Sequence, residues 1–175
     1  MIRRAYRLTT REFAQTAFSG EGARRWGGRW NNPGTAVVYA ADSLSLAQLE
    51  LLVRLHRADL IRQRFCCVVA ELPAELVLPT DALGELPTDW AAGIPRPTTQ
   101  QMGDRWVREQ RSVAVEVPSA ITAGEMNFLL NPGHPDFARI KVFPPADFAF
   151  DGRLFSVQPA LAPQPTQSPR IPPGA

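Results

Sequence analysis

Apolar residues recur along the chain in short blocks, and the spacing within these blocks predicts a mixture of strands and helices. Strand-like runs are predicted at residues 5–8, 36–41, 65–72, 112–117, 138–143 and 148–155. One helix is predicted from Ser43 or Ser45 to about Ala58, and another from Thr98 to about Gln110, because each begins at a capping residue. Residues 11–25 are predicted to be loop. Since strands and helices do not alternate regularly, the pattern favours the α+β class.

The stretch 23–55 is the centre of the chain. It opens with Arg-Trp-Gly-Gly-Arg-Trp, which predicts a loop that runs into a short strand, and Pro33-Gly34 then signals a turn before the strand at 36–41. On the following helix, Glu50 lies within an arc of apolar residues (Leu46, Ala47, Leu49 and Val53). A carboxylate in that position is costly unless it is paired, hydrogen-bonded or facing a cleft. Glu50 is therefore either half of a buried ion pair with an arginine or a catalytic group.

Arg29 is the second polar residue of interest in this stretch. Its neighbours Gly27 and Gly28 allow a backbone or a flat ligand to approach closely. Taken alone, Arg29 would be an exposed loop charge. Its combination with Glu50, and with Tyr39 between them in the sequence, favours a functional site instead.

Length and composition indicate one globular domain. The chain has 175 residues, of which 45% are hydrophobic and 21% charged, and the domain is expected to occupy residues 1–157. Proline recurs without apolar periodicity in residues 158–175, which predicts a disordered tail. No run has the length of a membrane span or the apolar core of a signal peptide, so a cytoplasmic location is expected.

The two cysteines do not suggest a disulfide or a zinc site. Cys66 and Cys67 are adjacent in a predicted strand, so their side chains should point to opposite faces of the sheet. No spacing typical of zinc ligands surrounds them. Two buried free thiols are the expected state, as in a reducing compartment.

Positive charge is concentrated in the N-terminal part of the chain, although the net charge is only +2. Residues 1–64 contain eleven arginines against five acidic residues. Arginine is suited to bidentate binding of phosphate, so this charge indicates either a nucleic-acid surface or a pocket for a phosphorylated small molecule. The low net charge and the lack of a basic helix favour the pocket.

Two long blocks of the chain resemble one protein family. GARRWGGRWNNPGTAVVYAADSLSLAQLE resembles the core signature of the RES domain, which is named for an arginine, a glutamate and a serine. VPSAITAGEMNFLLNPGHPDFARIKV, residues 117–142, resembles the closing motif of that family, and the resemblance as a whole extends from about Tyr6 to Phe155. RES domains are toxins of bacterial RES–Xre toxin–antitoxin pairs. The resemblance therefore implies an ADP-ribosyltransferase-like fold, with a split central β-sheet and flanking helices around an NAD cleft.

The resemblance also implies roles for individual residues. Arg7 and Arg29 would hold the pyrophosphate of NAD⁺, and Tyr39 would wall its nicotinamide end. Glu50 would stabilise the positive charge that develops when the nicotinamide–ribose bond breaks, so that Glu50, Arg29 and Tyr39 carry the reaction. Nicotinamide leaves as a neutral molecule, so no general acid is strictly required, and no metal is expected.

Ser119 is the residue that best fits the serine of the family, because its Val-Pro-Ser context resembles the motif, and Ser112 is the alternative. Ser119 is expected to contact NAD⁺ or to orient it rather than to act as a nucleophile, since no base is evident beside it. His134 is either catalytic or, as we favour, a structural residue that bonds loop carbonyls.

The implied function is that of a toxin that cleaves the nicotinamide–ribose bond of NAD⁺. The acceptor would be water, phosphate or a protein, giving hydrolysis, phosphorolysis or ADP-ribosyl transfer. A cognate Xre-type antitoxin would block the active site, and nucleic acid would be contacted only through that antitoxin. The alternative is a non-catalytic module in which the arginine-rich half binds nucleic acid or a protein and Glu50 belongs to a core ion pair.

Overall fold

The computed structural model describes residues 1–55 and 64–155. Within these residues the fold is built on an eight-stranded sheet in the order β4-β5-β6-β2-β1-β3-β7, with β8 pairing to β3 outside this path. The strands are β1 (Ile2–Thr10), β2 (Val38–Ala41), β3 (Phe65–Pro73), β4 (Val77–Leu78), β5 (Ala114–Pro118), β6 (Met126–Leu130), β7 (Lys141–Val142) and β8 (Ala146–Phe148). The α-helices are α1 (Glu21–Trp26), α2 (Leu44–Leu52) and α4 (Pro97–Arg108). Short 3₁₀ helices are η1 (Arg11–Thr16), η2 (Ala74–Leu76), η3 (Thr80–Leu83), η4 (Pro135–Arg139) and η5 (Gly152–Phe155).

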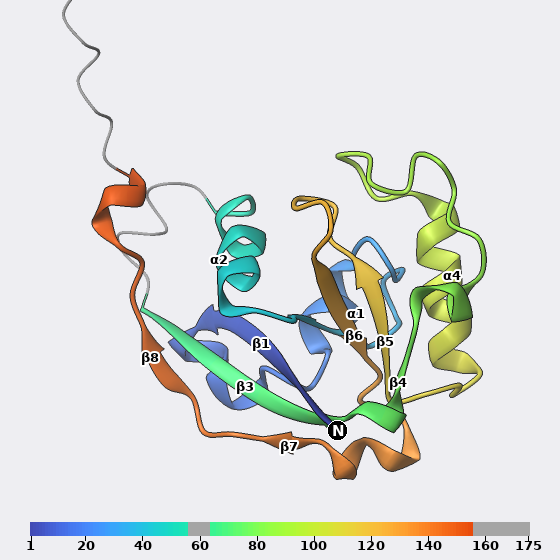
Figure 1. Ribbon diagram of the computed structural model, residues 1–175, viewed down its shortest axis with the longest axis horizontal. Coiled ribbons are helices and arrows are strands. Elements are labelled where there is room, and N and C mark those ends of the chain that lie inside the picture. Colours follow the sequence, from blue (N-terminus) through green and yellow to red (C-terminus); the bar gives the residue numbers. More distant parts are fainter. Residues whose placement is uncertain (56–63, 156–175) are drawn as a thin grey trace, which may run out of the picture.

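The sheet is almost divided between β1 and β2. β1 pairs with β3 along its whole length, from Ile2↔Pro73 to Thr10↔Phe65, but its pairing with β2 consists of Tyr6↔Ala41 alone. β2 instead pairs along its full length with β6. The two arms of the sheet diverge beyond that one bridge, with β1 and β3 on one side and β5 and β6 on the other (Figure 1). This is the split sheet that the resemblance implied.

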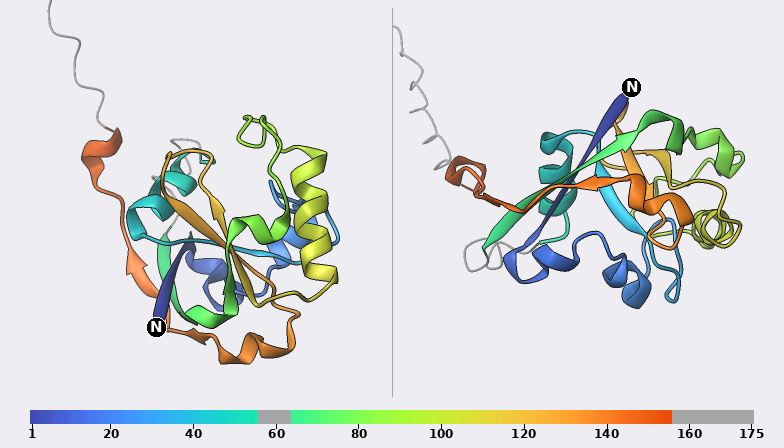
Figure 2. Two further views of the ribbon diagram at one scale, coloured as in Figure 1. Left: turned by 45° about the vertical axis from the view of Figure 1, so that its right-hand side comes forward. Right: turned by 90° about the horizontal axis from the view of Figure 1, so that it is seen from below.

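Three apolar clusters hold the arms and helices together. One contains Cys66, and a second lies beneath α2, where Leu46 and Ala47 contact Cys67. The adjacent cysteines therefore face opposite sides of the sheet, and both are buried free thiols, as predicted. The third cluster includes Met102 and Trp106 of α4. The two longer helices lie at separate ends of the sheet in both views of Figure 2.

Helix α2 begins as the sequence predicts but is shorter. Ser43 is its N-cap, and the Ser43 hydroxyl accepts a hydrogen bond of 3.1 Å from the backbone N–H of Leu46. Of the two predicted caps, Ser43 is therefore correct. The helix ends at Leu52, and the remainder of the prediction, to Ala58, runs partly outside the described residues.

Several predicted elements are wrong. Residues 11–25 are not loop, because η1 and α1 occupy most of them. Gly20 and Gly27, which both have positive φ, cap the two ends of α1. The helix buries none of its residues, so its sequence lacks the periodic apolar positions from which a helix is predicted. The short strand expected in Arg-Trp-Gly-Gly-Arg-Trp is reduced to one bridge, Gly28↔Asn31. The capping box at Thr98 is also wrong, because α4 begins at Pro97 after Arg96, without a side-chain cap.

The C-terminal strands are shorter than predicted. Most of the run at 138–143 is taken by η4 and β7, and the run at 148–155 contributes only Phe148 to a strand before η5. The proline-rich tail at 158–175 lies outside the described residues. Across residues 1–55 and 64–155, no helix combines the length and the apolar character that a bilayer span needs.

Candidate active site

A cleft of about 760 Å³ opens where the sheet is split. Its walls come from β1, β2, α1, α2 and the loops after α1 and β5. It is large enough for a ligand of dinucleotide size. Four of the five residues predicted from the sequence to form the site line it, together with two further polar residues: Arg7, Arg29, Tyr39, Glu50, Arg54 and Asn127.

Glu50 is held through one of its two carboxylate oxygens. Oε1 accepts a hydrogen bond of 2.7 Å from Asn127 Nδ2 and another of 3.2 Å from Ser119 Oγ. Oε2 lies 3.6 Å from an Arg54 guanidinium nitrogen, and the Glu50 side chain is 21% exposed. The helix surface around it differs from the prediction, since Leu49 and Val53 are exposed and only Leu46 and Ala47 are buried. Glu50 therefore faces the cleft, not the middle of a buried arc.

This geometry differs from the ion pair that the binding-module reading requires. The arginine next to Glu50 is Arg54, one helical turn further along the chain, and its side chain is 63% exposed. Exposed pairs of this kind contribute little to stability. The firm contacts of Glu50 are with the neutral donors Asn127 and Ser119, which orient a carboxylate without neutralising it.

Ser119 and Ser112 have different surroundings. Ser119 Oγ accepts hydrogen bonds of 3.1 Å from the backbone N–H groups of Ile121 and Thr122, and it donates its own hydrogen to Glu50. Ser112 Oγ is buried in the core, where it contacts Trp106 Nε1 at 2.9 Å and the Ala114 carbonyl at 2.7 Å. Of the two serines, it is Ser119 that meets the predicted glutamate.

Arg7 is a partly buried cation that lines the cleft. Its Nη1 donates a hydrogen bond of 2.5 Å to the Tyr39 carbonyl, which is accessible because β1 and β2 have diverged. Its Nε is buried without a hydrogen-bond partner among the described residues. Burial, and secondarily the charge of Arg54, lowers the pKa of Arg7 to about 10. A partly buried guanidinium with spare donors is suited to an anionic ligand.

Arg29 lines the cleft and is held by contacts with Trp90 and with Thr99 of α4. Its Nη1 donates to the Trp90 carbonyl at 2.6 Å, and its carbonyl accepts a hydrogen bond of 2.7 Å from Thr99 Oγ1 of α4. Partial burial lowers the pKa of Arg29, and Arg54 acts in the same direction, while the charge of Glu50 opposes them. Arg29 and Glu50 both line the cleft.

Tyr39 lines the cleft, and its hydroxyl is hydrogen-bonded within the protein. The hydroxyl donates to Asn31 Oδ1 at 2.7 Å and accepts from the Trp30 N–H at 3.0 Å. Burial raises its pKa, so the phenol stays protonated. A Cβ at Gly28 would lie only 2.5 Å from the Tyr39 hydroxyl oxygen, so glycine is needed there for the loop to pack on the ring. Tyr39 thus anchors the arginine-bearing loop and forms a wall of the cleft.

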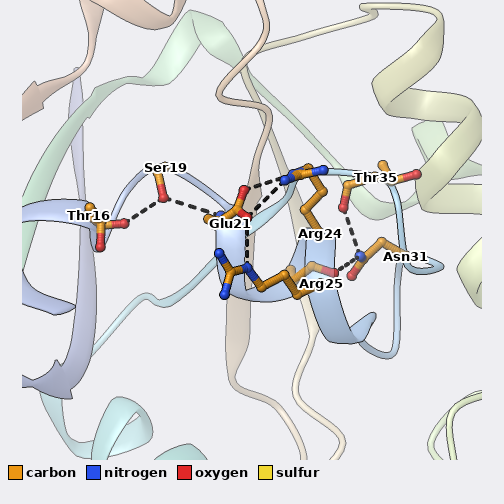
Figure 3. Close-up of polar contacts among 8 residues, drawn as sticks. Thr16, Ser19, Glu21, Arg24, Arg25, Asn31 and Thr35 are labelled. Atoms are coloured by element: carbon orange, nitrogen blue, oxygen red, sulfur yellow. Dashed lines mark hydrogen bonds and ion pairs between the residues drawn. The ribbon is translucent and has the colours of Figure 1, made fainter.

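The helix and turn around this loop are fixed by polar contacts (Figure 3). Glu21 binds Arg24 at 2.8 Å and Arg25 at 2.9 Å, and these hydrogen bonds lower the pKa of Glu21 to about 2. Asn31 Nδ2 donates to the carbonyls of Ala23 and Thr35, each at 2.9 Å. The buried Asn31 amide therefore ties α1 to the turn that precedes β2.

Two residues of the cleft, Asn127 and Arg54, were not predicted. Arg54 had a signal, because it follows Glu50 at the i,i+4 spacing of a helical ion pair. Asn127 had none, because its place beside Glu50 depends on the pairing of β6 with β2, Ala41↔Asn127. His134 is structural in its contacts, with Nε2 at 3.1 Å from the Gln110 carbonyl and Nδ1 accepting from the Asp136 N–H. Among the described residues, no three His, Cys, Asp or Glu side chains are grouped to hold a metal ion.

The sequence profile described as the RES domain matches residues 4–151. The chain belongs to the RES domain family. The resemblance found in the two sequence blocks is therefore confirmed. Its relatives include a protein named Toxin Res of Photorhabdus laumondii, which is 39% identical over 150 residues, covering 85% of this chain and 95% of the relative.

Two further comparisons extend this RES domain assignment. A protein named Prs ADP-ribosylating toxin of Sphingobium sp. is 37% identical over 153 residues, covering 85% of this chain and 94% of the relative. A chain in the crystal structure of the M. tuberculosis MbcT–MbcA toxin–antitoxin complex matches with a TM-score of 0.69 and 22% identity, covering 85% of each chain. This similarity confirms the predicted α+β class and its ADP-ribosyltransferase-like RES fold.

Proposed function

We propose that this RES domain protein is the toxin of a toxin–antitoxin pair and that it cleaves the nicotinamide–ribose bond of NAD⁺. The observation that carries the proposal is Glu50, an acid held by Asn127 and Ser119 at the wall of a cleft that is also lined by partly buried arginines. Relatives that share most of their length with this chain are named as toxins, and one of them as ADP-ribosylating.

The arginines fit the anionic part of the substrate. Arg7 has no carboxylate partner among the described residues, and its Nε has no hydrogen-bond acceptor there. Arg29 lines the same cleft. Two guanidinium groups at a shared cleft are suited to a pyrophosphate, because each offers several donors in a planar array. We therefore assign Arg7 and Arg29 to the pyrophosphate of NAD⁺.

Glu50 fits the reacting end. Departure of nicotinamide leaves positive charge on the ribose ring, and a nearby anion stabilises that transition state. Oε1 of Glu50 is occupied by Asn127 and Ser119, so Oε2 is the oxygen available to the ribose. Tyr39 would wall the nicotinamide end with its ring, since its hydroxyl is bonded to Asn31 and Trp30. Neutral nicotinamide departs with the electron pair of the broken bond and needs no proton from the protein.

The acceptor separates three versions of this reaction. Water gives ADP-ribose and a proton, phosphate gives an ADP-ribose phosphate ester, and a protein side chain gives an ADP-ribosylated protein. All three begin with the same bond cleavage. The name of the Sphingobium relative supports the third version as one to be tested.

An antitoxin is the proposed partner. The structural neighbour was solved as a toxin–antitoxin complex, which supports a partner of this class. We propose an Xre-type antitoxin that covers the cleft and so prevents NAD⁺ from entering. Addition of such a partner should abolish turnover in a 1:1 ratio.

The experiment that tests the proposed function uses NAD⁺ labelled in its nicotinamide and, separately, in its adenine. Purified protein should release labelled nicotinamide, and the adenine label should then appear in ADP-ribose, in its phosphate ester when phosphate is added, or in protein when a cell extract is added. Retention of both labels in intact NAD⁺ under all three conditions would contradict the proposal.

A further inference from the structure

Trp26 is an exposed aromatic residue on the wall of the cleft. Its side chain is 84% exposed, and it is among the residues that line the cleft. The other three tryptophans are packed: Trp106 and Trp30 are buried, and Trp90 stacks on Trp30 with ring centroids 6.0 Å apart. Trp26 therefore contributes little to the core, and its broad apolar surface is left open beside the arginines.

The backbone around Trp26 is held in place. Trp26 is the last residue of α1, and Gly27 closes the helix with φ 71° and an N–H bond of 2.8 Å to the Ala23 carbonyl. A Cβ at Gly27 would lie 3.0 Å from Pro33 Cδ and 3.1 Å from the Asn31 carbonyl oxygen, so the helix end is packed against the following turn. The packing therefore fixes the position of the Trp26 backbone at the wall of the cleft.

Space for a flat group lies next to the Trp26 side chain. Gly22 and Ala23 precede Trp26 by four and three residues, so they share its face of α1, and both line the cleft. A Cβ at Gly22 would meet nothing within 4 Å. The wall therefore consists of one large ring beside two of the smallest residues, which is a surface that a planar ring can cover.

We propose that Trp26 is a stacking platform for the adenine base of NAD⁺. The assignment rests on the proposed function, because it takes the substrate to run along the cleft. Arg29, three residues after Trp26, would hold the pyrophosphate, and Glu50 would face the ribose of the nicotinamide. The base is then the part of the substrate left to contact α1. Stacking of a base on an aromatic ring is a common source of affinity and needs no hydrogen bonds from the protein.

The test compares the two halves of NAD⁺, AMP and nicotinamide mononucleotide, by isothermal titration. The Trp26→Ala variant should bind AMP roughly tenfold more weakly than the wild type, since a stacked base contributes about that much. Trp26→Phe should recover most of the affinity, and nicotinamide mononucleotide should bind all variants equally. Phe13→Ala is the matched control, because Phe13 is also an exposed aromatic residue but does not line the cleft.

Turnover gives a second readout. Trp26→Ala should raise the KM for NAD⁺ by a similar factor and leave kcat unchanged, because the adenine lies far from the bond that breaks. Unchanged AMP affinity in Trp26→Ala, or an equal loss for both half-substrates, would overturn the assignment and leave Trp26 as a contact for a protein partner. If the wild type bound AMP through Trp26 but released no nicotinamide, the proposed function would fail while the base site would stand.

Discussion

Asn127 and Glu50, 77 residues apart in the chain, are joined by a hydrogen bond of 2.7 Å between Asn127 Nδ2 and Glu50 Oε1. Asn127 lies on β6, opposite Ala41 of β2, and Glu50 lies on the helix that follows β2. The pairing of β2 with β6 therefore places a neutral donor beside the acid. An amide fixes the direction of a carboxylate and leaves it charged, which is the state needed to stabilise a cationic transition state.

The first prediction concerns this pair. Asn127→Asp should shift the acidic limb of the pH profile of kcat to higher pH, because two carboxylates at hydrogen-bond distance cannot both ionise as readily as one. Asn127→Ala should lower kcat by about tenfold or more with a smaller shift, since Glu50 loses a hydrogen bond to its charged form but gains no negative neighbour. Rates of nicotinamide release between pH 4 and pH 9 provide the measurement. An identical profile for both variants would show that Asn127 has only a structural role.

Arg7 should lower the stability of the free protein and raise its affinity for an anionic ligand. Burial lowers its pKa to about 10, so the folded state holds this cation at a cost, and that cost falls when an anion binds. Arg7→Met keeps much of the side-chain volume and removes the charge. We expect its Tm to equal or exceed that of the wild type, although the bond to the Tyr39 carbonyl is lost.

The same variant should lose its response to ligand. ADP-ribose, which keeps the pyrophosphate and has no nicotinamide to lose, should stabilise the wild type by mass action, so its Tm should rise with ADP-ribose concentration, whereas that of Arg7→Met should stay constant. Arg108→Met is the control, because Arg108 is exposed on the last turn of α4. A rise in Tm that is as large in Arg7→Met as in the wild type would remove Arg7 from the binding site.

Gly103 should be indispensable to the support of the arginine loop. It lies within α4, where a Cβ would come 1.8 Å from the Trp30 carbonyl oxygen and 2.9 Å from its carbonyl carbon. Gly103→Ala should therefore destabilise the fold by more than about 2 kcal/mol, although alanine is the better helix former. Gly22→Ala, on open α1, should be neutral or stabilising by up to about 1 kcal/mol. Urea denaturation measures both, and equal midpoints for the two variants would contradict the packing described here.

A helix or strand could be predicted only where the local sequence of that segment was enough to determine it. The buried strand at 65–72 and the capped start of the helix at Ser43 depend on local sequence, and both are correct. α1 could not be predicted, because its ends are set by two glycines with positive φ and it buries none of its residues. The order of the strands depends on pairing between distant segments and was not predicted, since the family resemblance implied only a split central sheet.

The residues of the site could also be predicted only where one segment of the chain contained them. Arg29, Tyr39 and Glu50 come from one continuous block and were recognised together, and the structure places all three at one cleft. Asn127 was missed because an asparagine within a strand gives no sign of which residue it will meet. The choice between Ser119 and Ser112 likewise depended on the direction of the chain after β5, which brings Ser119 to Glu50 and keeps Ser112 in the core. Their roles in the reaction remain predictions.

The measurement that tests the central claim most directly is the initial rate of nicotinamide release from NAD⁺ by the wild type and by Glu50→Gln. The exchange keeps the shape of the side chain and removes the charge, so we expect a fall in kcat of at least about a hundredfold with little change in Tm. Glu109→Gln, at the exposed end of α4, should retain full activity. Release by Glu50→Gln at the wild-type rate would contradict the account, because no other acid lines the cleft among the described residues.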